Sequence, residues 1–219
     1  MKYGVLGTGI VGDALATKLA ELGHEVMMGG RSANHKNAQA WLAKVSAAGA
    51  KGTARIGTFA DAAHFGEIVL NCTQGSGTLD ALKTVDSQDL AGKVLIDVAN
   101  PLDFSSGTMV LTIVNSNSLG ETIQRAYPQT KVVKALNTVN IQVMVNPAIV
   151  PGDHDLFICG DDEGAKEQVS AMLREFGWRS IVDLGGIVNS RATEQMIPLW
   201  MRLFGIYGSP LFNFKVVKR

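Results

Sequence analysis

The chain has 219 residues, enough for one large α/β domain or for one domain with a small appendage. Hydrophobic residues make up 46% of it, which allows a sizeable core, and 20 basic residues balance 20 acidic ones. Because no run of like charge is present, we expect neither nucleic acid nor an anionic membrane as a partner. The first predicted strand begins at residue 2, and the longest apolar stretch, residues 196–206, is too short to span a bilayer. We therefore expect a cytoplasmic protein.

The first 31 residues predict a strand, a glycine-rich turn, a helix and a second strand. An apolar run at residues 3–6 leads into a G-x-G-x-x-G pattern at residues 7–12. Helical spacing of apolar residues follows as far as Leu22, and residues 26–28 indicate the next strand. In such a turn the glycines allow a tight reversal, close approach of a pyrophosphate and packing of the helix on the strand. The pattern predicts a dinucleotide site with its phosphates at the start of the helix.

The residues after the second strand select the dinucleotide. NAD enzymes usually carry Asp or Glu there, whereas this chain has Arg31 and Ser32, with His35 and Lys36 close behind. A carboxylate would repel a 2′-phosphate, but the Arg31 guanidinium can bind it through two parallel hydrogen bonds and Ser32 can donate another. The pattern therefore favours NADP(H), with a solvated basic loop as the alternative.

Strand and helix patterns alternate through the rest of the chain, which predicts a parallel sheet with helices on both faces. Further strands are predicted at residues 54–57, 68–73, 94–99, 131–136, 155–160 and 180–184, and helices at residues 38–47, 58–64, 79–85, 119–127, 163–176 and from about 191. Ser118 and Glu121 predict a capping box. We expect Pro198 to kink the last helix. That helix is apolar on most faces, so we expect it to be buried against the Rossmann core or against another subunit.

The predicted fold class is α/β, an NAD(P)-binding Rossmann fold with a doubly wound, mainly parallel sheet and a small C-terminal extension of strands and helices. We place the NADP-binding domain at residues 1–149 and a small domain that completes the acceptor cleft at residues 150–219. The apolar last helix and residues 205–214 predict a homodimer, because monomers seldom leave such patches exposed.

The carboxyl ends of four strands are the expected site, because ligands of open α/β sheets lie there, at the switch point of the strand order. The residues at these ends are small and polar, which suits the nicotinamide–ribose half of a cofactor; ordinary turn residues are the alternative. The expected cofactor-binding residues are Gly7, Thr8, Gly9, Ile10, Val11, Gly12, Arg31, Ser32, Lys36, Cys72, Thr73, Ala99, Asn100, Pro101, Asn137, Thr138 and Val139.

We assign no catalytic residue and no metal ligand from the sequence. His64 and His154 have no Ser, Cys or Asp at a useful spacing. Cys72 and Cys159 fall inside strand-like runs, where small buried thiols are expected. Hydride transfer between two ring systems needs alignment rather than a nucleophile, which favours a reductase with a ring acceptor over an alcohol dehydrogenase.

These residues resemble a known family, the NADP-dependent oxidoreductases of the deazaflavin coenzyme F420 and their bacterial relatives. The resemblance covers nearly the whole chain and rests on residues 7–12, 22–31, 132–139, 159–162 and 189–200. It implies an N-terminal Rossmann domain with a small C-terminal part, and an acceptor ring stacked on the nicotinamide in the cleft between them. Arg31 and Ser32 would then hold the 2′-phosphate, while Asn137, Thr138 and Val139 would line the cleft.

The chain departs from the family pattern at Gly30, where Ser is usual, at Asn140, where Pro is usual, and in the loop at residues 100–104. The acceptor is therefore left open among F420, a flavin and a quinone-like ring. Two other functions stay open: a non-catalytic NADP(H)-binding sensor or partner protein, and an NADP-dependent hydroxyacid or imine reductase. The last would need a longer helical C-terminal domain than residues 150–219 provide.

Overall fold

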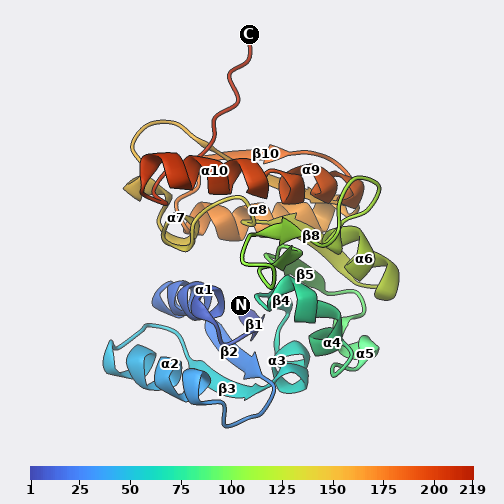
Figure 1. Ribbon diagram of the computed structural model, residues 1–219. Coiled ribbons are helices and arrows are strands. Elements are labelled where there is room, and N and C mark those ends of the chain that lie inside the picture. The colour runs from blue at the N-terminus through green and yellow to red at the C-terminus, as the bar shows by residue number, and fades with distance from the viewer.

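The computed structural model describes residues 1–219 and forms one eight-stranded sheet with helices on both faces (Figure 1). From one edge to the other the strands follow the order β3-β2-β1-β4-β5-β8-β9-β10. Every neighbouring pair is parallel except β8 and β9, which are antiparallel. The bounds are β1 (Lys2–Leu6), β2 (Glu25–Gly30), β3 (Ala54–Thr58), β4 (Ile68–Asn71), β5 (Val94–Asp97), β8 (Lys131–Ala135), β9 (Asp155–Gly160) and β10 (Ser180–Asp183). The α/β Rossmann fold is thereby confirmed.

Two hydrophobic clusters pack on the two faces of the sheet, because neighbouring residues of a strand point to opposite faces. Val69 of β4, for example, belongs to one cluster and its neighbour Leu70 to the other. The larger cluster lies under α1 (Ile10–Glu21), α2 (Lys36–Ala47), α7 (Ile141–Val145) and α8 (Glu163–Glu175). The smaller one lies under α3 (Phe59–Phe65), α4 (Thr78–Leu82), α5 (Ser87–Leu90) and α6 (Leu119–Ala126).

The strand order reverses direction between β1 and β4, from which the chain proceeds outward to β2 and β3 on one side and to β5 and β8 on the other. At such a switch point the connecting loops diverge and leave a crevice beyond the carboxyl ends of the strands. The glycine-rich turn after β1 lies at this place, which positions the candidate site.

Residues after 150 extend the same sheet. The strands β9 and β10 flank α8 in the sequence, and α9 (Ser190–Gln195) and α10 (Ile197–Tyr207) follow them (Figure 1). The antiparallel pairing of β8 with β9 marks the place where the regular Rossmann alternation ends. The division of the chain into two domains at residue 150 stays a prediction.

The last helix differs from its prediction. It is divided at Met196 into α9 and α10 rather than kinked at Pro198. Pro198 occupies the first turn of α10, where its missing N–H is not needed for a helical hydrogen bond. The prediction that this helix is buried against the Rossmann core is wrong for most of α10. Only Ile197 is buried, while Ile206 and Tyr207 are more than half exposed. Burial against a second subunit stays a prediction.

Only one of the two hydrogen bonds of the predicted capping box forms at the start of α6. The hydroxyl of Ser118 accepts a hydrogen bond from the backbone N–H of Glu121, as expected. The carboxylate of Glu121, however, accepts from the Ser118 hydroxyl and from the guanidinium of Arg191 in α9. It therefore ties α6 to the C-terminal helices instead of closing its own helix end.

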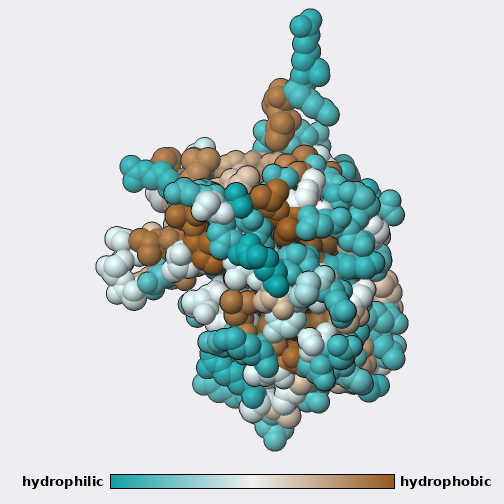
Figure 2. Space-filling view, turned by 90° about the vertical axis from the view of Figure 1, so that its right-hand side faces the viewer, coloured by the Kyte–Doolittle hydropathy of each residue, from teal (hydrophilic) through white to brown (hydrophobic).

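A two-stranded hairpin of β6 (Leu102–Asp103) and β7 (Val110–Leu111) was not predicted, since two-residue strands carry no periodicity. After α10 the chain end projects from the body, an apolar stretch followed by a hydrophilic tip (Figure 2). No helix in the structure combines the length and the hydropathy needed to cross a membrane.

Candidate functional site

A groove with a volume of about 860 Å³ runs over the carboxyl ends of β1, β2 and β4. Most of the side chains that line it are polar. One end of the groove is formed by Arg31, His35 and Asn37, and the other by Cys72, Thr73 and Gln74. Gly7, Thr8 and Gly9 lie on its floor, where α1 begins. The groove thus has the polarity expected for a dinucleotide phosphate chain.

A side chain at each of the three glycine positions of the turn would meet different surroundings. Gly7 has a φ of +130°, and a Cβ added to it would lie 2.5 Å from the carbonyl oxygen of Cys72. A Cβ on Gly12 would lie 2.1 Å from the carbonyl oxygen of Gly7. A Cβ on Gly9 would meet no protein atom within 4 Å. The fold therefore requires glycine at positions 7 and 12, whereas at position 9 only a ligand would.

Hydrogen bonds hold the start of α2 against the glycine-rich turn. The Thr8 hydroxyl and His35 Nδ1 are 3.1 Å apart, and the side-chain amide of Asn37 donates to the carbonyl oxygen of Thr8 over 3.1 Å. Arg31 extends from the end of β2 into the same end of the groove. Ser32 and Lys36 are exposed beside it but do not line it.

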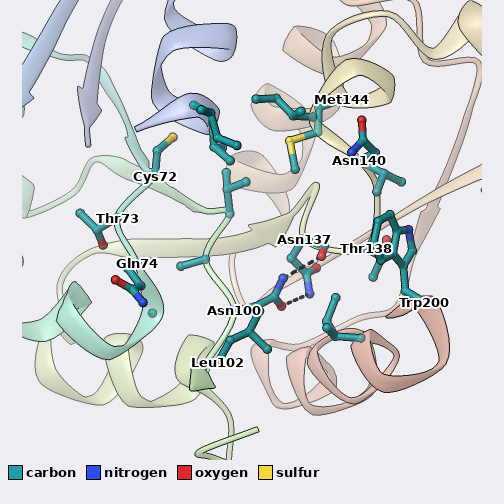
Figure 3. Close-up of a pocket in the computed structure, with 18 of the residues that line it drawn as sticks. Cys72, Thr73, Gln74, Asn100, Leu102, Asn137, Thr138, Asn140, Met144 and Trp200 are labelled. Atoms are coloured by element: carbon teal, nitrogen blue, oxygen red, sulfur yellow. Dashed lines mark hydrogen bonds between the residues drawn. The ribbon is translucent and has the colours of Figure 1, made fainter. Parts of the chain in front are cut away.

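A second cavity of about 420 Å³ continues from the groove, with Cys72, Thr73 and Gln74 lining both (Figure 3). Most of its lining residues are hydrophobic, and none is Lys, Arg, Asp, Glu or His. Met144, Asn140 and Trp200 stand opposite the β4 loop in Figure 3. The complete lining is Ile10, Val11, Cys72, Thr73, Gln74, Gly75, Val98, Ala99, Asn100, Leu102, Phe104, Asn137, Thr138, Val139, Asn140, Ile141, Met144, Ile197, Trp200 and Met201.

Two asparagines join the loops that follow β5 and β8 (Figure 3). The amide of Asn100 donates to the backbone carbonyl oxygen of Asn137 over 2.8 Å, and the amide of Asn137 donates back to Asn100 Oδ1 over 3.0 Å. Asn137 is 4% exposed, yet its Oδ1 has no hydrogen-bond partner in the protein, and neither has Nε1 of Trp200. An unpaired buried polar atom costs free energy. Both residues line the cavity, so a ligand with polar groups fits this lining.

A buried polar network fixes the loop after β4. The hydroxyl of Thr73 donates to Asn71 Oδ1 over 2.6 Å and lies 2.8 Å from the hydroxyl of Thr78. The amide of Asn71 donates to Asp97 at the end of β5 over 2.8 Å. These contacts hold Thr73 at the junction of the groove and the cavity.

The structure brings together most of the residues expected to bind a cofactor. Along the groove lie Gly7, Thr8, Gly9 and Arg31; Ile10, Val11, Ala99, Asn100, Asn137, Thr138 and Val139 line the cavity, and Cys72 and Thr73 line both. Gly12 and Pro101 are buried behind the lining, and Ser32 and Lys36 lie outside it. Residue roles toward a cofactor stay predictions.

Sequence reasoning expected residues 150–219 to complete the acceptor cleft, but it did not name the residues of that wall or the charges beneath it. Ile197, Trp200 and Met201, which form this wall, come from α10, far along the chain. A fully buried ammonium, Lys134, lies within hydrogen-bond distance of two buried carboxylates. In the sequence, Lys134 is a single lysine within the apolar run of β8, and this pattern does not indicate a buried ion cluster.

Neither cysteine has the character of a nucleophile. Cys72 and Cys159 are both free and buried, as expected from their strand-like surroundings. Burial raises the pKa of both thiols, so both are protonated at neutral pH. Cys72 contributes to the cavity wall as a small apolar group.

Comparisons with known proteins find related sequences and folds. The family model for coenzyme F420-dependent NADP oxidoreductases matches residues 2–101. The crystal structure of a candidate F420-dependent NADP reductase from Arthrobacter sp. FB24 is 42% identical, covers 100% of both chains and has a TM-score of 0.92. The F420-dependent NADP reductase of Methanothermobacter marburgensis is 29% identical over 210 residues, 93% of this chain and 92% of its own. An imine reductase from Myxococcus stipitatus in complex with NADP⁺ shares the fold alone, with 18% identity, a TM-score of 0.65 and coverage of 95% of this chain and 63% of its own.

Proposed function

Because this chain belongs to the family of coenzyme F420-dependent NADP oxidoreductases, we propose that its groove and cavity hold NADP(H) and a ring acceptor side by side. The chain is an NADP-dependent oxidoreductase. The observation that carries the proposal is the junction at Cys72, Thr73 and Gln74, where a polar groove opens into an apolar cavity. A cofactor that crosses this junction would have its phosphates in the groove and its nicotinamide in the cavity.

In the groove, the first turn of α1 would bind the pyrophosphate. The backbone N–H groups of the first turn of a helix have no helical partner, and the helix dipole makes this end positive. The open space beside Gly9 admits the phosphates to these groups. Arg31 would bind the 2′-phosphate at the far end, with Ser32 adding a hydrogen bond from the adjoining loop and Lys36 adding charge from the start of α2.

In the cavity, residues after β4, β5 and β8 would hold the nicotinamide and its ribose. Thr73, Ala99 and Asn100 line this part of the cavity, with Pro101 directly behind them. The unpaired Oδ1 of Asn137 fits the N–H of a carboxamide, and Thr138 and Val139 continue the same wall. Polar contacts of this kind fix the orientation of the ring, which decides which of its faces meets the acceptor.

When bound, NADPH supplies a hydride, so the nicotinamide is oxidised and the acceptor ring takes up the hydrogen with its two electrons. The chain's own part is to align the two rings and to exclude water. The apolar residues Ile141, Met144 and Ile197 serve that purpose from α7 and α10. No charged side chain lines the cavity, so we propose that it recognises the flat ring of the acceptor.

We propose that this acceptor is the deazaflavin ring of F420, the coenzyme named for the relatives, with a flavin or a quinone-like ring as alternatives. We further propose a cytoplasmic homodimer. The exposed apolar side chains of Leu199, Ile206 and Tyr207 on α10 support the dimer, and the two free thiols support a reducing compartment. Sedimentation velocity would report the mass: that of two chains supports the dimer, and that of one chain contradicts it.

The test is NADPH oxidation by the purified protein under anaerobic conditions. F420, FMN and a soluble quinone are offered separately, and NADH replaces NADPH in a parallel series. We expect turnover with F420 and a clear preference for NADPH over NADH. Tight binding of NADPH without turnover on any ring acceptor would contradict hydride transfer in this cavity.

A further inference from the structure

Beneath the cavity lies a buried ion cluster formed by Lys134, Asp97 and Glu194. The side chains of Lys134 and Asp97 are 0% exposed and that of Glu194 is 1% exposed. The ammonium nitrogen is 2.8 Å from Asp97 Oδ2 and 2.7 Å from Glu194 Oε1, and it also donates to the carbonyl oxygen of Ala99. All three N–H groups of the ammonium therefore have an acceptor.

Lys134 is charged in this environment. Burial alone would lower its pKa, but Asp97 and Glu194 outweigh burial and raise the pKa above the usual value. Because every N–H is engaged and the side chain is inaccessible, Lys134 has no free proton to exchange with a ligand. Its contribution is geometric.

Each carboxylate also binds backbone groups of its surroundings. Asp97 accepts from the backbone N–H of Ala99 over 3.2 Å. Glu194 accepts from the N–H groups of Leu119 and Gly120, over 2.8 Å and 3.1 Å, at the start of α6. These backbone bonds and the positive end of the α6 dipole offset the second negative charge of the cluster.

The cluster connects three walls of the cavity. Ala99 is itself a wall residue and is bonded by both Lys134 and Asp97. Asn137, which lies three residues after Lys134 in the chain, begins the β8 wall. Ile197, three residues after Glu194, begins the α10 wall. One ammonium thus links the loops proposed to hold the nicotinamide to the helix proposed to cover the acceptor.

We propose that Lys134 is a positioning residue for hydride transfer, which sets the distance between the two rings by fixing α9 and α10 against the loops after β5 and β8. This inference rests on the proposed function of the same cavity. In the transfer, the C–H bond of the nicotinamide breaks with both electrons and a C–H bond forms on the acceptor ring, whose displaced electron pair takes up one proton from water. The rate of such a step falls steeply as the two carbons separate, and a displacement of about 1 Å costs on the order of 100-fold.

The first experiment compares the wild type with Lys134→Met in single-turnover hydride transfer, using NADPH carrying protium or deuterium at the transferred position. We expect the transfer rate to fall by about 10-fold to 100-fold, and NADPH affinity, measured by nicotinamide fluorescence, to change by less than about threefold. The isotope effect should grow and become more dependent on temperature. A variant that is only partly folded would show a smaller amplitude of the single-turnover signal, but its isotope effect would equal that of the wild type.

A second variant keeps the test decisive if Lys134→Met folds poorly. Combining it with Asp97→Asn and Glu194→Gln removes all three charges together, and replacement of a buried ion cluster by neutral groups is often tolerated. The enlarged isotope effect should persist in this triple variant. A folded single or triple variant with the wild-type transfer rate and isotope effect would overturn the proposal.

Lys166→Met serves as the matched control. Lys166 is also nearly buried and bridges two carboxylates, Glu163 and Asp183, but these belong to α8 and β10, and none of the three residues lines the cavity. We expect its isotope effect to equal that of the wild type. An equal enlargement in both lysine variants would overturn a specific role of Lys134.

Hydrogen exchange of the cofactor-free protein separates failure of this inference from failure of the proposed function. In Lys134→Met the amides of Ala99, Leu119 and Gly120 should exchange at least about tenfold faster than in the wild type, because their carboxylate acceptors lose the ammonium. Unchanged exchange would overturn the link between the walls. A wild type that turns over no ring acceptor would instead contradict the proposed function, whatever the exchange shows.

Discussion

At the scale of single residues, Gly9 and Gly12 predict opposite outcomes for similar substitutions. Gly9→Val should retain its fold, because a Cβ there meets no protein atom within 4 Å, but should lose NADPH affinity by at least about tenfold, or roughly 1.4 kcal/mol. Gly12→Ala should lose about 1–3 kcal/mol of stability, because its Cβ would overlap the carbonyl oxygen of Gly7. Thermal unfolding and NADPH titration of both variants check this pair. Retained affinity in Gly9→Val would contradict phosphate binding at α1.

The choice of dinucleotide is predicted to reside at Arg31. Arg31→Glu should raise the KM for NADPH by about 10-fold to 100-fold, since hydrogen bonds to charged groups contribute about 1.5–3 kcal/mol. The KM for NADH should stay the same or fall. Lys51→Glu is the control, because Lys51 is an exposed cation before β3 that does not line the groove. If the KM values of both cofactors rise alike, Arg31 does not bind the 2′-phosphate.

Local motifs predicted the residues of the groove, because the features that a phosphate site needs lie close together in the sequence. A tight turn, a helix start and a cation after β2 lie within 31 consecutive residues. Lys134 and Trp200 could not be predicted in the same way. Lys134 meets Asp97 and Glu194 only once the sheet order and the position of α9 are set. Pairing across such separations leaves no periodic pattern in the sequence.

At the scale of elements, a carboxylate–guanidinium pair ties α6 to α9. Glu121 accepts two hydrogen bonds from Arg191, over 2.8 Å and 2.6 Å, and these bonds lower the pKa of Glu121 below its usual value of 4.5. A carboxyl group with a lowered pKa stabilises the folded state above its unfolded pKa, and this contribution is lost as pH falls through the folded pKa.

Glu121→Gln should therefore unfold at a lower temperature than the wild type at neutral pH. The difference should shrink as pH falls from about 4.5, where the carboxyl group of the unfolded chain takes up its proton, through the lower pKa of the folded state. Calorimetry of both proteins across this range measures the difference directly, with Lys83→Met, which breaks an exposed pair of α4, as a control. A difference that is independent of pH would contradict the charged pair.

The strands were predicted more closely than the helix ends. All eight strands of the main sheet are confirmed, although β4 and β5 end two residues before their predicted ends. They end at Asn71 and Asp97, whose side chains bond each other and the following loops. The division of α9 from α10 and the short hairpin of β6 and β7 depend on tertiary packing, which a periodic pattern does not record.

At the scale of the whole molecule, one sheet places the groove, the cavity and the buried ion cluster near the carboxyl ends of its strands. The order β3-β2-β1-β4-β5-β8 follows from right-handed βαβ connections, and the Rossmann pattern predicts it. The antiparallel entry of β9 turns the chain back, and α9 and α10 then cover the cavity from beyond the sheet. The residues of this return were not predictable from local sequence, although residues 150–219 were expected to complete the acceptor cleft, and α10 supplies one wall of the cavity.

The central claim is that a hydride passes directly from NADPH to a ring held in the apolar cavity. Transfer of deuterium tests it most directly: NADPH labelled at the transferred position is incubated anaerobically with the wild-type protein and F420, and the reduced coenzyme is analysed by mass spectrometry. We predict one deuterium on the carbon framework of the reduced deazaflavin and none released to water. Unlabelled reduced coenzyme, with deuterium in the solvent, would contradict the account.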